Sequence, residues 1–596
     1  MSSDSNRTMS SWTPKWWKEA TIYQIYPSTF LDSNGDGIGD IPGILQKLDY
    51  LQDLGVDVVW LSPHYKSPQV DMGYDISDYK DIYEKYGTLE QCLTLIKECH
   101  KRSIKIIFDL VINHTSDQHD WFIESKSSKD SPKRDWYIWR PAQYDKQGIR
   151  HPPNNWRSFF NGSAWTWDEK TEEYYLHLFT PEQPDLNWRN PITRDHIYQD
   201  SMLFWLEHGV DGFRIDVVEL YSKPEDFHDA PVTDPTSPWQ NCGPVVIDAP
   251  MLHEYLREMY SKAFGKYDCM TVGEGGGGSF EKALTFVGAS RKELNMAFQM
   301  GTTGVGVNHE QLLLKGYKLT EFKESVEKWQ HLMDGTDGWT TVFIENHDNP
   351  RSISRFGSEE TPELLFASGK MLSIMLITLS GTLFLYQGQE IGMVNMPKSW
   401  SLEEYKDVAT VNRVAEIKQK TDNDQKALEE ALEFYQVAAR DHARTPMQWS
   451  SELNGGFSTG EPWMRANPSY SFINAKSQEQ DPESLLSFWK AMLKFRREYK
   501  LCAVYGEFKS FDSDNEYVFS YTKKGTTGAI AVALNFTKEP QIYNLAEKLN
   551  LDSNRVELLV SNSLQHTEGE LQPYEGAIYN IEERSGAGTF ASPDVV

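Results

Sequence analysis

The stretch GFRIDVV, residues 212–218, carries an acidic residue, Asp216, at the end of a short apolar run. MTVGE, residues 270–274, repeats this arrangement with Glu274 in the same place. Short runs of β-branched and aromatic residues predict buried strands, and glycine marks the loops that follow them. We therefore predict that each carboxylate lies where a strand gives way to a loop. In a parallel barrel, that edge of the sheet carries the reacting groups.

A third acid follows the same pattern. Asp348 stands in FIENHDNPR, residues 343–351, directly after His347, and Arg214 precedes Asp216 by two residues. Two of the three acids thus have a neighbouring donor that can hold a carboxylate in place. A single acid at a strand end more often pairs with an arginine or caps a helix. Three acids in the same setting instead predict a catalytic site.

Cleavage of a glycosidic bond needs two carboxyl groups in different protonation states. One ionised carboxylate attacks the anomeric carbon, and one protonated carboxyl group donates to the leaving oxygen. We assign these roles to Asp216 and Glu274, so that Glu274 must hold its proton near neutral pH. A separation of about 5 Å between them would give retention of configuration. A third acid can bind the sugar hydroxyls as charge develops.

Alternating strand and helix patterns along the first 500 residues predict a parallel sheet covered by helices. Eight strands in this pattern indicate a (β/α)8 barrel. The least regular of them is LNMAF, residues 294–298, which is also compatible with a loop or a helical turn. The eight predicted strands are 22–26, 56–61, 105–111, 212–217, 270–273, 294–298, 340–344 and 382–386.

Three segments depart from a plain barrel. Residues 115–189 are dense in Trp, Asn, Pro and Tyr, and we interpret them as an inserted, lid-like domain after the third strand. Residues 401–439 are rich in Glu, Lys, Ala and Leu, which favours a helical excursion after the eighth strand. Residues 505–596 show period-two strands and predict a C-terminal antiparallel β-sandwich domain. The barrel domain would then comprise residues 1–114 and 190–504.

Composition narrows the classes of partner. The chain has 59 Lys and Arg against 87 Asp and Glu, a net charge of −28, which argues against nucleic acid or an anionic membrane surface. A neutral oligosaccharide fits this charge better. The N-terminal residues lack an apolar stretch of signal-peptide length, and the uncharged run 371–389 is interrupted by polar residues. We expect a cytoplasmic protein, as a monomer or a weak homo-oligomer.

Ordered motifs over nearly the whole chain resemble the α-amylase superfamily, glycoside hydrolase family 13, and within it the oligo-1,6-glucosidase, isomaltase and maltase group. The resemblance implies that Asp348 binds the 2- and 3-hydroxyls of a glucose, with His114 and His347 donating beside it. It also implies that Asp75, Tyr74 and Arg440 close the pocket around the non-reducing end and make cleavage exo-acting. The motifs are TIYQIYPSTFLDSNGDGIGDIPGI (21–44), DVVWLSP (57–63), MGYDISDY (72–79), DLVINHTS (109–116), QPDLNW (183–188), GFRIDVV, VGE, ENHDNPR, YQGQEIGM (386–393) and ARDHARTPMQW (439–449). With Gln183 from the fifth of these motifs, the predicted substrate-binding set is Asp75, Tyr74, His114, Gln183, Arg214, Val217, His347 and Arg440.

The segment DSNGDGIGD, residues 32–40, places oxygen ligands on alternate residues, with glycines that let the loop curl. Hard cations such as Ca²⁺ or Mg²⁺ prefer such an oxygen shell. The segment is similar to the first half of an EF-hand loop, but Gly43 stands where the bidentate glutamate is expected. A plain Asn/Asp/Gly turn is the alternative. By the resemblance, we expect a structural ion held by Asp32, Asn34, Asp36, Ile38 and Asp40, and no organic cofactor.

The residue after the predicted nucleophile bears on linkage preference. In the yeast-type members of the group this residue is usually Thr in enzymes that favour α-1,4 bonds and Val in those that favour α-1,6 bonds, and here it is Val217. We therefore favour isomaltose-type substrates. The alternative is that Val217 only continues a buried strand. Val218 and Glu219 replace an expected Ala-Gly pair, and residues 275–278 are all glycine, so the pocket could also admit maltose, sucrose or aryl glucosides.

Two rival functions use similar sequences. A glucosyl-transferring enzyme, such as a sucrose isomerase or a trehalose-forming synthase, would use the same three acids and differ only in which molecule intercepts the intermediate. A catalytically silent transporter partner would carry a membrane helix and lack the acids, and this chain shows neither feature.

Overall fold

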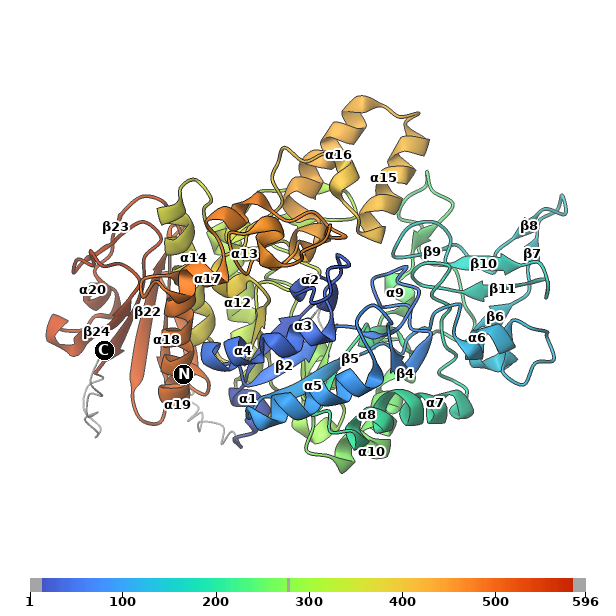
Figure 1. The fold of residues 1–596 in the computed structure, drawn as a ribbon, viewed down its shortest axis with the longest axis horizontal. Helices are drawn as coiled ribbons and strands as arrows, with labels where there is room; N and C mark the ends of the chain where they lie inside the picture. The colour runs from blue at the N-terminus through green and yellow to red at the C-terminus, as the bar shows by residue number, and fades with distance from the viewer. Residues whose placement is uncertain (1–12, 276–278, 583–596) are drawn as a thin grey trace, which may run out of the picture.

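The computed structural model describes residues 13–275 and 279–582. Its centre is a sheet of eight parallel strands in the order β15-β14-β12-β5-β2-β1-β19-β18. Two of these strands, β2 and β5, are labelled in the middle of Figure 1. Thr341 Oγ1 on β18 donates to the carbonyl of Ala297 on β15 over 3.2 Å, so the two ends of this order meet in a nearly closed (β/α)8 barrel. Each strand overlaps a predicted run. Their bounds are β1 Thr21–Ile25, β2 Val58–Leu61, β5 Lys105–Leu110, β12 Gly212–Ile215, β14 Met270–Gly273, β15 Met296–Ala297, β18 Thr341–Val342 and β19 Thr382–Tyr386.

Alternate residues of the barrel strands belong to two different cores. On β2, Val58 and Trp60 belong to the cluster inside the barrel, whereas Val59 and Leu61 pack toward the helices. This follows from the period of two in a strand, since both faces of a parallel barrel sheet are covered. The strands are therefore apolar throughout, which is why the sequence shows them as continuous runs.

Helices cover the outside of the barrel. The N-terminus of α5 has a capping box between Thr88 and Gln91, and its buried residues Cys92, Leu95 and Cys99 recur at helical spacing. No helix within the described ranges is both long and apolar enough to span a lipid bilayer. The covering helices are α3 Ile41–Gln46, α4 Leu48–Leu54, α5 Leu89–Lys101, α7 Pro191–Ile197, α8 Phe204–Glu207, α10 Leu252–Lys262, α11 Phe280–Val287, α12 Leu319–Gln330, α14 Pro362–Thr378 and α18 Leu485–Glu498.

The segment after β5 forms short strands beside the barrel, at the right of Figure 1. A further strand, β13 (Gln240–Asn241), comes from the loop that follows β12 and pairs in parallel with β9 (Trp156–Arg157) of this segment. Phe227, Cys242 and Val246 of the same loop join the apolar cluster of the inserted segment. The sequence did not indicate this contribution. The other strands are β6 Trp139–Arg140, β7 Gln143–Tyr144, β8 Arg150–His151, β10 Trp165–Asp168 and β11 Glu173–Leu176.

The predicted helical excursion after β19 is confirmed as α15 (Val408–Lys420) and α16 (Gln425–Ala438), which project at the top of Figure 1. Asp407 caps the N-terminus of α15 by accepting from the N–H of Ala409 over 3.1 Å. The two helices pack on each other through an apolar cluster that includes Val414 and Phe434.

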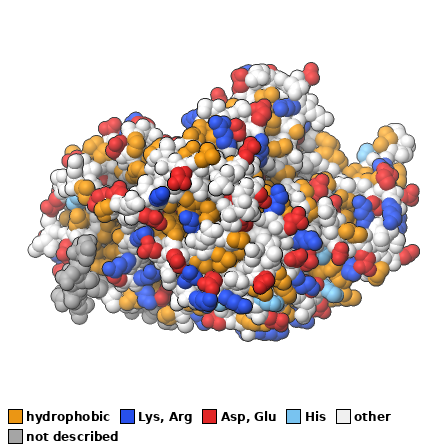
Figure 2. All heavy atoms as spheres, in the orientation of Figure 1, with side chains coloured by type: hydrophobic (Ala, Val, Ile, Leu, Met, Phe, Trp, Pro, Cys, Tyr) orange, Lys and Arg blue, Asp and Glu red, His pale blue; other side chains and the backbone are white. Residues whose placement is uncertain are grey.

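The C-terminal region forms a five-stranded antiparallel sheet with a small two-stranded sheet, at the left of Figure 1. It rests on α14, where Tyr521 and Thr378 share a hydrogen bond of 2.6 Å between their hydroxyl groups. Acidic and basic side chains are interspersed over the face shown in Figure 2. The strands are β20 Glu507–Phe511, β21 Val518–Lys524, β22 Ala529–Asn535, β26 Gly576–Ile581 and β24 Val556–Ser561, with β23 Gln541–Ile542 and β25 Glu570–Leu571 in the small sheet.

Candidate active site

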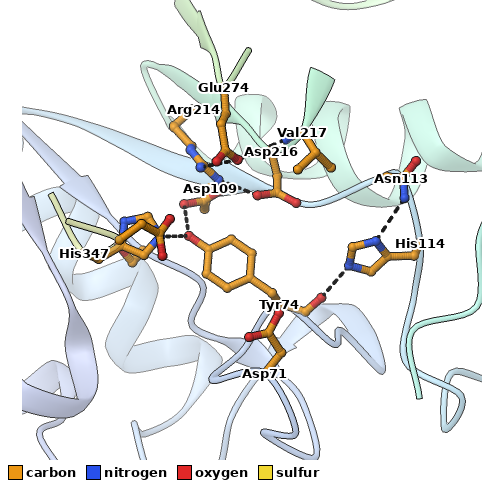
Figure 3. Close-up of polar contacts among 12 residues, drawn as sticks. Asp71, Tyr74, Asp109, Asn113, His114, Arg214, Asp216, Val217, Glu274 and His347 are labelled. Carbon is orange, nitrogen blue, oxygen red and sulfur yellow. Dashed lines mark hydrogen bonds and ion pairs between the residues drawn. The ribbon is translucent and has the colours of Figure 1, made fainter. Parts of the chain in front are cut away.

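Arg214 lies at the centre of the site (Figure 3). Its Nη1 donates to Asp216 Oδ1 over 2.6 Å and to Asp109 Oδ1 over 2.8 Å, and its Nη2 donates to Glu274 Oε2 over 2.6 Å. The three acids stand at the ends of β12, β5 and β14, which are neighbours in the barrel. The Arg214 side chain is only 2% exposed. It was predicted to bind substrate, and its hydrogen bonds go to Asp109 and to both predicted catalytic acids.

Three acidic side chains surround the single positive charge of Arg214. Burial raises the pKa of Asp216 well above its usual range, the negative charges of Glu274 and Asp109 add to this, and Arg214 opposes it. Burial likewise raises the pKa of Asp109, against the charge of Arg214. Three carboxyl groups around one guanidinium would carry a net negative charge out of water if all were ionised, which is costly. Burial thus favours the neutral forms of Asp216 and Asp109, and the charge of Arg214 favours their ionised forms.

Val217 has a backbone conformation that is rare for a β-branched residue. Its φ of 34° and ψ of 47° lie in the left-handed region. Its N–H donates to Glu274 Oε2 over 3.2 Å. The prediction that the strand runs to Val217 is wrong, because β12 ends at Ile215. The strained turn directly after Asp216 thus makes direct contact with the predicted acid.

Asp348 is surrounded by two guanidinium groups and an imidazole ring. Its Oδ1 lies 3.0 Å from Arg440 Nε and 3.1 Å from Arg444 Nη2, and its Oδ2 lies 3.0 Å from His347 Nε2. Burial alone would raise the pKa of Asp348, but Arg440, His347 and Arg444 hold it well below its usual range. These neighbours favour the ionised form of Asp348, which suits a group that accepts hydrogen bonds.

The orientation of His347 is fixed on both sides. The amide of Gln24 donates to Nδ1 over 2.7 Å, which places the ring proton on Nε2, toward Asp348. Tyr74 stacks on the same ring at 5.6 Å between centroids, and its hydroxyl lies 2.7 Å from Nε2 (Figure 3). The Tyr74 hydroxyl also reaches Asp109 Oδ2 at 3.2 Å, which links Asp348 to the Arg214 cluster.

His114 and Gln183 meet at the other side of Tyr74. His114 Nε2 lies 2.9 Å from the Tyr74 carbonyl, and Gln183 Nε2 lies 3.2 Å from the same ring nitrogen. Burial lowers the pKa of His114 to about 4, so the ring is neutral at physiological pH. Gln183 also donates to Asp71 Oδ2 over 3.1 Å.

Asp75, which the family resemblance places at the non-reducing end of the pocket, makes its hydrogen bonds within its own turn. Its carboxylate accepts from Ser67 Oγ and from the N–H groups of Val70 and Asp71, so it holds the local turn together. Asp71 faces Arg440, with Oδ1 3.9 Å from Arg440 Nη2. This buried oxygen has no hydrogen-bond partner in the described residues, and burial raises the pKa of Asp71 to about 7.

Sequence reasoning also missed Arg444, Asp407 and Asp109. Arg444 lies four residues after Arg440 in the same motif, and that spacing was a usable signal, since it places both side chains on one face of a helical turn. Asp407, the cap of α15, pairs with Arg444 and lies 3.3 Å from Arg440 Nε. No local pattern marks Asp407, because it lies 33 residues before Arg440 in the sequence and only the fold of the helical excursion brings the two together.

The 32–40 loop lies apart from these acids, against residues 457–463. Both oxygens of Asp32 accept hydrogen bonds, from three loop N–H groups and from Ser458 Oγ. Asp40 caps α3 and accepts from Ser33 and Gly43. Within residues 13–275 and 279–582, no three His, Cys, Asp or Glu side chains converge as metal ligands. A cation would compete with the loop N–H groups for the oxygens of Asp32.

Comparison with known proteins agrees with this geometry. The profile of the α-amylase catalytic domain matches residues 24–549. An α-glucosidase of Candida albicans is 49% identical, covering 95% of this chain and 99% of that protein. An oligo-1,6-glucosidase of Saccharomyces cerevisiae is 46% identical, covering 96% and 98%. The crystal structure of an isomaltulose synthase from Protaminobacter rubrum superimposes with a TM-score of 0.89 at 37% identity, covering 96% and 100%.

The carboxylates at the ends of neighbouring barrel strands, the inserted segment after β5 and a match over most of the chain agree with one another. The chain belongs to the α-amylase family of glycoside hydrolases.

Proposed function

We propose that this protein is a retaining, exo-acting α-glucosidase that removes terminal α-linked glucose from short oligosaccharides and prefers α-1,6 bonds. The main observation behind the proposal is that Arg214 donates hydrogen bonds to both Asp216 and Glu274. One guanidinium holds the two carboxyl groups at 2.6 Å each. Retaining glycosidases need one ionised and one protonated carboxyl group close together.

The reaction proceeds in two displacements. Asp216 attacks the anomeric carbon as the bond to the leaving oxygen breaks, and Glu274 gives its proton to that oxygen. A β-linked glucosyl-enzyme results. Glu274 then takes a proton from water, whose oxygen attacks the same carbon and releases Asp216. Two inversions give retention of the α configuration. Glu274 suits the proton transfer because its side chain is 23% exposed, against 6% for Asp216.

The surrounding groups provide a site for one glucose. Asp348 accepts from two sugar hydroxyls. His347 lies next to it at 3.0 Å, and His114 lies at the other side of Tyr74. Asp71 and Arg440 close the site at the non-reducing end. Asp71 Oδ1 lies 3.9 Å from Arg440 Nη2, so both side chains can also make polar contacts with a sugar. A closed end of this kind limits cleavage to one terminal unit at a time.

Val217 supports the α-1,6 preference. Its left-handed turn presents a half-buried, apolar side chain directly after the nucleophile. An isopropyl group cannot hydrogen-bond the leaving sugar, so it favours the more flexible geometry of a 1,6 linkage. The broader alternative, an α-1,4 or sucrose-cleaving α-glucosidase, uses the same acids.

Product configuration tests the proposal. NMR during hydrolysis of isomaltose should show α-glucose as the first product, and β-glucose first would reject a retaining mechanism. Asp216→Ala and Glu274→Gln should each lower kcat by several orders of magnitude. Azide should partly rescue Glu274→Ala with formation of α-glucosyl azide, because azide needs no general base. Near-normal turnover in Asp216→Ala would contradict the assignment.

A glucosyl-transferring enzyme is the second candidate, favoured by the structural similarity to an isomaltulose synthase. Chromatography of the products from sucrose separates the two. Free glucose and fructose support hydrolysis, whereas isomeric disaccharides as the main products would support transfer.

We also propose that Ca²⁺ or Mg²⁺ binds the 32–40 loop. Burial and the neighbouring charge of Asp32 raise the pKa of Asp40, and a cation would relieve that repulsion. Thermal unfolding should shift upward with added Ca²⁺, and Asp36→Ala should reduce the shift. Asp49→Ala, on α4, is the matched control. An unchanged unfolding temperature at millimolar Ca²⁺ would reject the site.

We further propose a cytoplasmic monomer or weak homo-oligomer without nucleic-acid or membrane partners. The five free cysteines suit a reducing compartment. Sedimentation analysis of the purified protein and fractionation of the source cells would test these points.

A further inference from the structure

Glu219 lies beside the predicted acid Glu274. It stands in the short 3₁₀ turn Val218–Leu220, three residues after Asp216. A Cβ atom placed on Gly275 would lie 2.7 Å from Glu219 Cγ and 2.8 Å from Glu219 Oε2. The Glu219 side chain therefore occupies the space that any side chain at position 275 would need.

The backbone holds this arrangement. The N–H of Val218 donates to the carbonyl of Glu274 over 3.0 Å, and the carbonyl of Glu219 accepts from the N–H of Asp248 over 3.0 Å. Gly275 has a φ of +103°, which favours glycine independently of space. Gly275 and Glu219 are thus a matched pair. Gly275 allows the backbone turn, and its missing side chain leaves the space that the Glu219 side chain fills.

We propose that Glu219 is a specificity-determining residue for the leaving group, with its carboxylate taking the place of a side chain at position 275. The proposal rests on the proposed function, in which Glu274 protonates the leaving oxygen. The group that departs must lie on the side of Glu274, and Gly275 is the next residue of the chain. Glu219 is half-exposed there.

The chemistry of a carboxylate defines what it selects. It accepts strong hydrogen bonds from the hydroxyl groups of a leaving sugar, because charge-assisted hydrogen bonds are the stronger kind. An aryl leaving group offers no such donor, and a phosphorylated sugar would be repelled. Glu219 should therefore favour neutral, hydroxyl-rich leaving groups over aryl ones that share the same glucosyl unit.

The test compares kcat/KM for isomaltose with kcat/KM for p-nitrophenyl α-glucoside. A hydrogen bond to a charged group contributes about 1.5–3 kcal/mol, so Glu219→Ala should lower the isomaltose-to-aryl ratio on the order of tenfold or more. Glu219→Gln keeps the size, removes the charge and should lower the ratio less. Glu254→Ala, an exposed glutamate on α10, is the matched control and should leave the ratio unchanged.

A double-mutant cycle tests the pairing itself. Gly275→Ala should displace the Glu219 side chain and lower the same ratio, so adding Glu219→Ala should lower the ratio no further. Additive effects would overturn the matched pair. Ratios within twofold of wild type in both Glu219 variants, with folding checked by thermal unfolding, would overturn the specificity role while α-glucosidase activity stands. Absence of any α-glucoside cleavage by the wild-type protein would instead reject the proposed function and this inference with it.

Discussion

Asp109 accepts a 2.8 Å hydrogen bond from Arg214, the residue that also grips both predicted catalytic acids. Asp109 is fully buried and bonds further to Trp60 Nε1 and the Tyr74 hydroxyl, each at 3.2 Å. It orients Arg214 and adds negative charge to the cluster.

Asp109→Asn should lower kcat about 10- to 100-fold, because it weakens one hydrogen bond to a charged group. It should also move the acidic limb of the pH profile. The charge of Asp109 raises the pKa of Asp216, so its removal should lower that pKa and keep this proposed nucleophile ionised to lower pH. Steady-state kinetics from pH 4 to 8 measure both effects. A lower kcat with an unmoved profile would mean that Asp109 is only structural.

Asp71 and Asp75 allow a paired test of the non-reducing end. Asp71→Asn should lower kcat/KM for isomaltose about 10- to 100-fold, since it removes the charge that faces Arg440 and the sugar. Asp75→Asn should instead act on stability, because the Asp75 carboxylate accepts from two backbone N–H groups and Ser67. Kinetics and thermal unfolding of both variants measure the difference. Equal losses of kcat/KM in the two variants would mean that Asp75 also acts in the substrate-binding site.

Val217→Thr should shift preference from isomaltose toward maltose, because a hydroxyl group next to the proposed nucleophile can hydrogen-bond the leaving sugar. We expect a change of about tenfold in the ratio of the two kcat/KM values. Val217→Ala serves as the control for size alone. A ratio that is the same in all three proteins would assign linkage preference to other residues of the leaving-group side.

Four buried histidines predict loss of stability in mild acid. Burial lowers the pKa of His114 to about 4 and the pKa of His64, His119 and His442 to about 3. The unfolded chain binds these protons near pH 6.5. Between those values the unfolded state holds more protons, so stability is full above pH 6.5 and is lost as the pH falls.

Unfolding near pH 5 should therefore take up about four protons through these rings. The slope of unfolding free energy against pH measures them. His119→Asn should reduce the slope by about one proton, since asparagine can keep the cap that His119 provides to α6 (Asp120–Ser125). A substitution at the exposed His228 should leave the slope as it is. An unchanged slope in His119→Asn would contradict the explanation.

The sequence predicted the barrel well because each strand is a local apolar run between loop signals. It also placed Asp216 and Glu274 at strand ends, and the barrel brings both onto one guanidinium. These features depend on residues that are close in the chain, or on the fixed direction of parallel strands. Asp348 instead lies in a loop, six residues after β18 ends at Val342.

Other features depend on contacts that no local pattern shows. Asp71 and Asp75 flank one turn, and only the φ of 101° at Gly73 and the surrounding packing decide which acid turns toward Arg440. The left-handed conformation of Val217 contradicts its β propensity and is held by Glu274 from another strand. Tertiary contacts override propensity in both places.

The pairing of β13 with β9 has a practical meaning for protein engineering. The loop that follows β12 supplies part of the sheet and core of the neighbouring inserted segment. A chimaera that grafts residues 115–189 from a relative while leaving residues 221–251 unchanged would therefore combine two halves of different cores. Exchanging the two segments together keeps the β13–β9 pairing and the shared apolar cluster intact.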